Sequence, residues 1–467
     1  MNRFSAWATR SLTEIAPRYL PFADAASETL PLGRLLRLSL FQVSVGMALV
    51  LLVGTLNRVM IVELDVPASL VGIMLSLPLI FAPFRALIGF KSDTHVSALG
   101  WRRVPYIWQG TLLQWGGFAI MPFALLVLSG KDYVADWPQW VTDWVGPASA
   151  ALAFLLVGAG VHIVQTVGLA LATDLAPRED QPKVVGLMYV MLLVGMIVSA
   201  LLFGLLLNPY FPARLIQVIQ GAAVVTMVLN VIAVWKQEPR DRSRTIKPTV
   251  EPEFSEHWRA FISRRNALRG LIVIGLGTLG FGMADVLLEP YGGQVLAMTV
   301  SQTTKLTAVF AGGGLIGFAW ASRVLSRGYD PLRMAGWGAL LGLPGFAAII
   351  SATPVGSTPL FILGTLLVGF GGGLFSHGTL TATMRLAPKE QVGLALGAWG
   401  AVQATAAGVG IAAAGVIRDV VKSLPVGGTF GAATPYVTVF AIEILFLVLA
   451  LIAILPLLRQ DTLTAET

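Results

Sequence analysis

Apolar runs long enough to cross a bilayer recur along almost the whole sequence. A helix that crosses a hydrocarbon core of about 30 Å needs roughly 20 mainly apolar residues. Of the 467 residues, 55% are hydrophobic and 12% are charged, and the mean hydropathy is +0.76. The sequence therefore predicts an all-α integral membrane protein. It contains no cysteine, which excludes disulfides, thiolate metal sites and thiol catalysis.

Hydropathy predicts twelve membrane-spanning helices. Their approximate bounds are 36–62, 68–90, 104–128, 148–173, 184–207, 213–235, 268–290, 304–325, 332–352, 358–384, 391–416 and 434–457. The longest polar interval separates six spans from six and is interpreted as a linker between two bundles. The predicted units are an N-terminal segment (1–35) able to form an interfacial amphipathic helix, a first bundle (36–235), the linker (236–267), a second bundle (268–458) and a tail (459–467).

The basic residues predict the orientation of the chain. Most of the 32 lysines and arginines fall in the N-terminal segment, the linker and the loops on the same side. The loops on the other side carry only Lys131, Arg214, Lys305, Arg418 and Lys422. Because basic loops stay in the cytoplasm, both termini and the linker are expected to be cytoplasmic. The net charge of +7 is then an orientation signal, and no nucleic-acid partner is expected.

Two pairs of repeated segments indicate an internal duplication. "LVGAG" followed by "LAPRE" (156–160 and 175–179) recurs at a constant offset as "LVGFG" followed by "LAPKE" (367–371 and 386–390), and "LIGF" occurs at 87–90 and 315–318. Each pair falls at corresponding spans of the two halves. This pattern resembles the major facilitator superfamily, whose fold has twelve transmembrane helices in two pseudo-symmetric six-helix bundles.

The polar stretch "GFKSDTHVSALGWRRVP" between the second and third spans resembles a loop signature of that superfamily. The matching residues are Gly89, Asp93, Gly100, Arg102 and Arg103. Asp93 is expected to bond the first-turn amides of a neighbouring helix, and the paired arginines are expected to hold the loop at the cytoplasmic face. Arg85, one turn before Gly89, is expected to reach Asp93 or a lipid phosphate.

Three charged residues inside spans are costly in a bilayer and therefore need partners. They are Arg58 in the first span and Asp285 and Glu289 in the seventh. We predict a buried ion pair between Arg58 and Asp285, with Glu63 as a competing partner for Arg58. The functional alternative is a proton-coupling or solute-binding site. Glu443, in the middle of the last span, has no partner evident in the sequence.

Several longer segments resemble the PucC/LhaA family of photosynthetic bacteria, also called the bacteriochlorophyll-delivery family. They include "RYLPFADAASETLPLGRLLRLSLFQVSVGMA", "GTLNRVMIVEL", "APFRALIGFKSDTHVSALGWRRVPYIW" and "GGFAIMPFALLVLSG". The resemblance implies an assembly factor for the light-harvesting antenna, core or peripheral, in the inner (intracytoplasmic) membrane. It implies bacteriochlorophyll a as cofactor and the antenna α/β polypeptides, the reaction centre–antenna complex and bacteriochlorophyll synthase as partners. No enzymatic activity is expected.

The only histidines inside predicted spans are His162 and His377, on the same face of equivalent helices. A neutral imidazole is a suitable axial ligand for the magnesium of bacteriochlorophyll, and Gln165 is a further candidate pigment contact. The alternative is an ordinary hydrogen bond between helices, to Gln165, Ser376 or a backbone carbonyl. Without the family resemblance, the sequence would equally fit a proton-coupled secondary transporter of an amphipathic small molecule.

Overall fold

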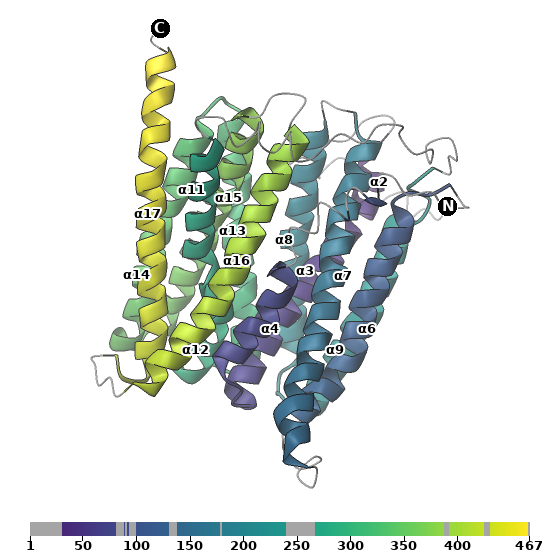
Figure 1. Cartoon of the computed structure of the whole chain (residues 1–467), viewed down its shortest axis with the longest axis vertical. Helices are drawn as coiled ribbons and strands as arrows, with labels where there is room; N and C mark the ends of the chain where they lie inside the picture. The colour runs from purple at the N-terminus through teal and green to yellow at the C-terminus, as the bar shows by residue number, and fades with distance from the viewer. Residues whose placement is uncertain are drawn as a thin grey trace.

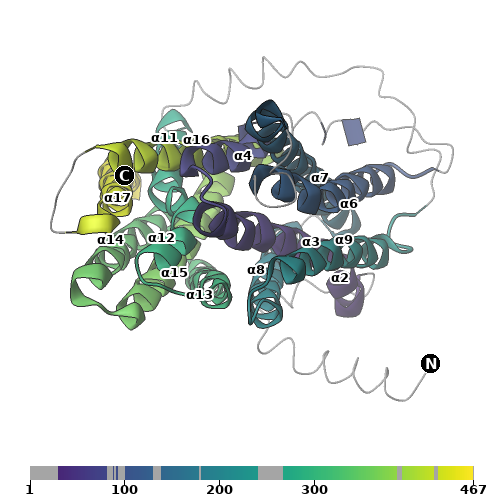
Figure 2. The same cartoon turned by 90° about the horizontal axis from the view of Figure 1, so that it is seen from below.

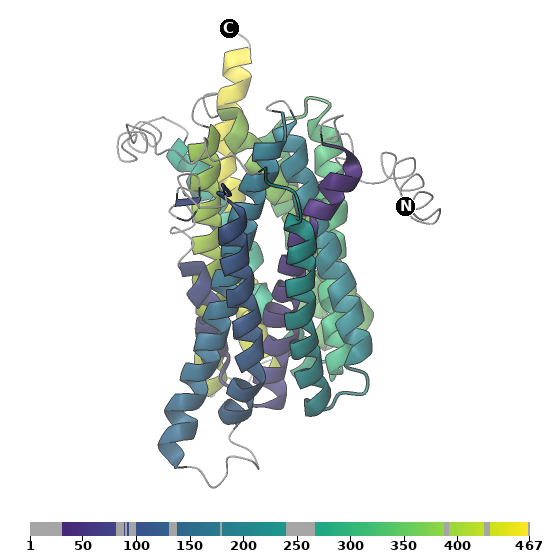
Figure 3. The ribbon, with the colours of Figure 1, turned by 90° about the vertical axis from the view of Figure 1, so that its right-hand side faces the viewer.

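The computed structural model describes residues 30–80, 88, 91–92, 100–129, 138–177, 180–239, 267–386, 392–424 and 430–465. Throughout these residues the regular structure is helical, and the long helices run side by side (Figures 1 and 3). Eleven of the described helices are long and apolar enough to cross a membrane. A shorter apolar helix, Ala68–Leu79, stands at the second predicted span, whose remainder lies largely outside the described residues.

The first bundle contains the first six spans. The first span consists of α2 (Leu32–Leu38), α3 (Leu40–Leu49) and the π-helical segments η2 (Val50–Leu56) and η3 (Val59–Glu63). The next five spans are formed by α4 (Ala68–Ile80), α6 (Val104–Ser129), η5 (Val141–Val145) with α7 (Gly146–Leu175), α8 (Gln181–Leu206) and α9 (Pro212–Val234).

The second bundle repeats this arrangement. Its first span is divided into α11 (Ala267–Gly282), the 3₁₀ turn η7 (Ala284–Val286) and α12 (Leu288–Gln294). The others are α13 (Val300–Leu325), α14 (Pro331–Val355), α15 (Thr358–Leu386), α16 (Val392–Ser423) and η9 (Gly431–Ala433) with α17 (Thr434–Ala465).

The sequence repeat coincides with structural equivalence. The segments 156–160 and 367–371 lie in α7 and α15, and these helices end at Leu175 and Leu386, the same position of the repeat. In α7 the end has a local cause, because Ala176 precedes a proline and is extended, with ψ 143°. The repeated segments therefore occupy equivalent positions in two helices, as the duplication inferred from the sequence requires.

The two bundles meet along two pairs of helices. Figure 2 shows α4 beside α16 and α8 beside α13, and both pairs are in contact. The α4–α16 contact is close enough to exclude a side chain: a Cβ added at Gly415 would lie 2.3 Å from the carbonyl oxygen of Ala68. The main hydrophobic core runs through both bundles. We call the end where α9 stops, near Glu238, the linker end, and the opposite end the far end.

Candidate functional site

The seventh span is interrupted in its second half. α11 ends at Gly282, a 3₁₀ turn follows, and α12 begins only at Leu288. Such a break leaves backbone amides and carbonyls without helical partners, and at membrane depth it is tolerated only where other protein groups satisfy them. The acidic residues of the seventh span lie at this break.

Side chains from two other spans satisfy the break. The amide of Ala284 donates a hydrogen bond to Glu443 Oε1 of α17 at 2.5 Å, and Asn57 Nδ2 of the first span donates to the carbonyl oxygen of Val286 at 2.9 Å. The side chain of Glu443 is completely buried, at 0% exposure. Glu443 thus holds the last span against the interrupted one.

A cavity of about 140 Å³ lies between the bundles beside the break. Asp285 and Glu289, both predicted site residues, line it together with the hydroxyl-bearing Thr307 and Thr365. The remaining lining is apolar: Leu49, Val53, Gly54, Met196, Leu288, Leu306 and Phe310. Because a buried water needs roughly 10–15 Å³ of such space, the cavity has room for several waters or a small ligand.

Glu289 lies on the wall of this cavity and is only 3% exposed. Its Oε1 accepts a hydrogen bond from the hydroxyl of Thr307, whereas Oε2 has no hydrogen-bond partner among the described residues. The first span passes directly over the carboxyl at Gly54, where an added Cβ would lie 2.5 Å from Glu289 Oε1. A glycine at position 54 therefore leaves the space that the carboxyl occupies.

Arg58 pairs with Glu63, so the predicted ion pair with Asp285 is not the one that forms. The guanidinium Nη1 donates to Glu63 Oε1, and Nη2 donates to the carbonyl oxygen of Met298 at 3.2 Å. The physical reason is the π-helical backbone of η3, in which residues five apart share hydrogen-bonded turns and approach each other. Arg58 consequently closes the far end, and Asp285 faces the cavity.

Further hydrogen bonds hold the two bundles together toward the far end. Asp419 accepts from the amide of Ser69 at 2.7 Å, and Ser301 donates to the carbonyl oxygen of Gly204 at 2.6 Å. Gln294 donates to the carbonyl oxygen of Ile61 at 3.3 Å. Together with the contacts of Arg58 and Asn57, these bonds close the cavity on that side.

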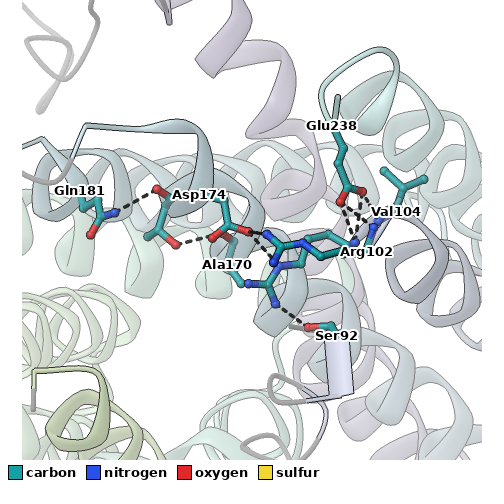
Figure 4. A network of polar contacts seen from close by, with 9 residues as sticks. Ser92, Arg102, Val104, Ala170, Asp174, Gln181 and Glu238 are labelled. Carbon is teal, nitrogen blue, oxygen red and sulfur yellow. Dashed lines mark hydrogen bonds and ion pairs between the residues drawn. The ribbon is translucent and has the colours of Figure 1, made fainter. Parts of the chain in front are cut away.

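A second polar cluster organises the linker end of the first bundle (Figure 4). The Arg103 guanidinium donates to Asp174 at the end of α7 at 3.0 Å and to the hydroxyl of Ser92 at 2.6 Å. Arg102 lies 3.5 Å from the same aspartate. Glu238 accepts from the amides of Arg102, Arg103 and Val104 at 2.7–3.1 Å, and thereby caps the start of α6.

The loop signature is therefore structural in the part that the structure describes. Gly100 adopts a left-handed conformation, φ 77°, that favours glycine. Glu238, from the start of the linker, accepts from the first amides of α6, which is the kind of contact expected of Asp93. Asp93, Gly89 and Arg85 lie outside the described residues.

The predicted pigment ligands lie in the expected helices. His162 and Gln165 are half-buried in α7, and His377 is half-buried in α15 with its ring centroid 4.2 Å from that of Phe318. Neither histidine lines the acidic cavity. A neutral imidazole has the donor chemistry that a magnesium tetrapyrrole requires, and both histidines lie outside the cavity.

The fold defines the class of the protein. Two bundles of equivalent helices around a cavity at their interface are the architecture of the major facilitator superfamily, and solved structures agree. A POT family transporter superposes with a TM-score of 0.67 over 92% of this chain and 98% of its own, at 13% identity. The nucleoside transporter NupG superposes with a TM-score of 0.64 over 91% of this chain and 99% of its own, at 14% identity.

Within that class, the chain belongs to the PUCC protein family, whose model matches residues 55–462. It is 72% identical to Protein PucC of Cereibacter sphaeroides over 96% of this chain and 97% of that one. It is 62% identical to Protein PucC of Rhodobacter capsulatus, over 98% and 99% of the two chains. A bacteriochlorophyll synthase 44.5 kDa chain of Rhodobacter capsulatus is 29% identical over 90% of this chain and 94% of its own. The chain is thus a multi-pass membrane protein related to proteins of photosynthetic bacteria.

Proposed function

We propose that this protein is an assembly factor for a bacterial light-harvesting antenna. It would bind and deliver bacteriochlorophyll a, chaperone the antenna polypeptides in the membrane, or do both, for the core or the peripheral antenna. The observation that carries this proposal is the 72% identity to Protein PucC along almost the full length of both chains.

The proposal assigns pigment binding to His162 and His377, with Gln165 as a further contact. A bound bacteriochlorophyll would supply a magnesium ion with an open axial position, and a neutral imidazole nitrogen is a ligand for it. Since neither histidine lines the cavity between the bundles, the pigment would lie outside it, against α7 and α15. The partners would be the antenna α/β polypeptides, the reaction centre–antenna complex and bacteriochlorophyll synthase, in the intracytoplasmic membrane with both termini cytoplasmic.

The test is purification of the full chain from a bacteriochlorophyll-producing host that lacks its own copy. We expect near-infrared-absorbing pigment and antenna polypeptides to copurify, the latter identified by mass spectrometry. A protein that carries neither would contradict the assembly role.

Combined His162→Ala and His377→Ala substitutions test the ligands, and Gln165→Ala tests the neighbouring contact. His257→Ala, a histidine of the linker sequence, is the matched control. The double variant should lose most of the pigment while the control keeps it. Full pigment retention in the double variant would remove both histidines as ligands.

A further inference from the structure

The interrupted seventh span concentrates three carboxyl groups in a small volume. Asp285 and Glu289 belong to the span itself and line the cavity. Glu443 reaches the break from α17 and accepts the hydrogen bond of the Ala284 amide. Asp285 lies in the break, Glu289 in the first turn of α12, and Glu443 in the first half of α17.

The carboxyl groups form no ion pair with basic side chains of the described residues, and Arg58 acts on Glu289 only through space. The nearest guanidinium, Arg58, is paired with Glu63 and with a carbonyl oxygen. No lysine or arginine within the described ranges forms an ion pair with Asp285, Glu289 or Glu443. Carboxylates are costly in a low-dielectric interior, so these groups are stable only when each binds a proton or when a cation compensates the charge.

The groups around the carboxyls indicate where that charge would bind. The unpartnered Oε2 of Glu289 belongs to a side chain that is 97% buried on the cavity wall. The hydroxyls of Thr307 and Thr365 are further oxygen atoms on the same wall, whereas the other lining side chains are apolar. Glu443 faces the amides of Met283 and Ala284 and the carboxyl of Asp285, and its own Oε2 also lacks a hydrogen-bond partner in the described part of the chain.

We propose that Glu289 and Asp285 form a buried binding site for one small monovalent cation, either a proton or an alkali ion, at the break of the seventh span. Glu443 is the positioning residue of this site, because it fixes the break by accepting the hydrogen bond of the Ala284 amide. The cavity volume leaves room for a small ion with several waters. The inference requires neither a transport cycle nor the antenna role.

The experiment measures thermal unfolding of the full chain in nanodiscs of uncharged lipid by tryptophan fluorescence. The midpoint is recorded in sodium, potassium and choline chloride of equal ionic strength, at neutral and at mildly acidic pH. A ligand that binds only the folded state raises the midpoint with concentration. A rise with sodium or potassium over choline at constant pH identifies an alkali ion, and a rise on acidification alone identifies a proton.

The variants Glu289→Gln and Glu443→Gln distinguish the site from general salt effects. Glu289→Gln should abolish the cation-dependent shift, and Glu443→Gln should weaken the apparent affinity at least tenfold while its amide oxygen still accepts the Ala284 hydrogen bond. Asp143→Asn removes an exposed carboxyl outside the site and should respond like the unsubstituted protein. If Glu443→Gln does not fold, the cation-dependent shift of the unfolding midpoint in Glu289→Gln alone tests the site. A midpoint that responds to no cation, or a response that survives in Glu289→Gln, overturns the proposal.

Discussion

The carboxyl of Glu443 and the amide of Ala284 meet at 2.5 Å, although 159 residues separate them in the chain. This contact joins the last span to the first span of the second bundle at the point where that span is broken. Because it supplies a partner to a backbone group that has lost its helical one, the break and the buried acid depend on each other.

Removing the acceptor should therefore destabilise the protein. We expect Glu443→Ala to lower the free energy of unfolding by about 1–3 kcal/mol, since it leaves a buried amide without a partner. Glu443→Gln keeps an acceptor oxygen, so its free energy of unfolding should fall clearly less than that of Glu443→Ala. Equilibrium unfolding in mixed micelles measures the free energy of unfolding of both variants. Equal decreases in the two variants would show that Glu443 does not stabilise the protein through this hydrogen bond.

The close approach of Gly54 to Glu289 predicts a steric penalty. A Cβ at position 54 would also lie 2.9 Å from Thr307 Oγ1, so Gly54→Ala should cost about 1–3 kcal/mol of unfolding free energy. The matched control is Gly116→Ala in α6, where an added Cβ meets nothing within 4 Å. Combining Gly54→Ala with Glu289→Asp, which shortens the side chain, should recover part of the loss. Strict additivity of the two substitutions would argue against direct contact.

The cap that Glu238 provides predicts local protection of the start of α6. In Glu238→Ala, the amides of Arg102, Arg103 and Val104 should exchange hydrogen for deuterium about tenfold faster, because a helix cap is worth about 1–2 kcal/mol. The control Asp180→Ala breaks a pair with Lys183 whose ions are 3.5 Å apart on the surface. Such pairs contribute about 0–1 kcal/mol, so exchange near α6 should not change.

The orientation predicted from basic residues can be tested directly because the sequence has no cysteine. Ser326→Cys, exposed between α13 and α14 at the linker end, should react with an impermeant thiol reagent only from the cytoplasmic side. Ser423→Cys, exposed at the far end of α16, should react only from the opposite side. The reverse labelling pattern would mean that the basic loops do not set the topology.

The sequence predicted the architecture well because the thickness of the bilayer fixes the length of each span and the internal repeat fixes how the spans are divided between two bundles. The division into two bundles and the equivalence of α7 and α15 follow from run lengths and from the repeated "LAPRE" and "LAPKE" segments. Of the twelve predicted spans, eleven correspond to described helices long enough to cross a membrane, and the second is described only as the shorter helix α4. Asp285 and Glu289, for which the sequence left a polar site as the alternative to an ion pair with Arg58, line the cavity.

The partners of individual charges could not be predicted, because they depend on backbone detail and on long-range packing. For Arg58 the sequence left Asp285 and Glu63 as competing partners, and the choice of Glu63 depends on a π-helical segment that no sequence pattern predicted. Glu443 was recognisable only as a costly charge in need of a partner, and its partner is a backbone amide exposed by an unpredicted break. Glu238 was assigned to the linker, where nothing in its surroundings indicated a helix cap.

The close contact of α4 with α16 limits where a lipid-soluble molecule can enter the space between the two bundles. At Gly415 and Ala68 the two backbones touch, and at Gly72 an added Cβ would lie 2.8 Å from the carbonyl oxygen of Ile411. No acyl chain or flat hydrophobic molecule can slip through a seam whose main chains are already in contact. A lateral portal from the bilayer into the space between the halves must therefore open elsewhere than along this seam.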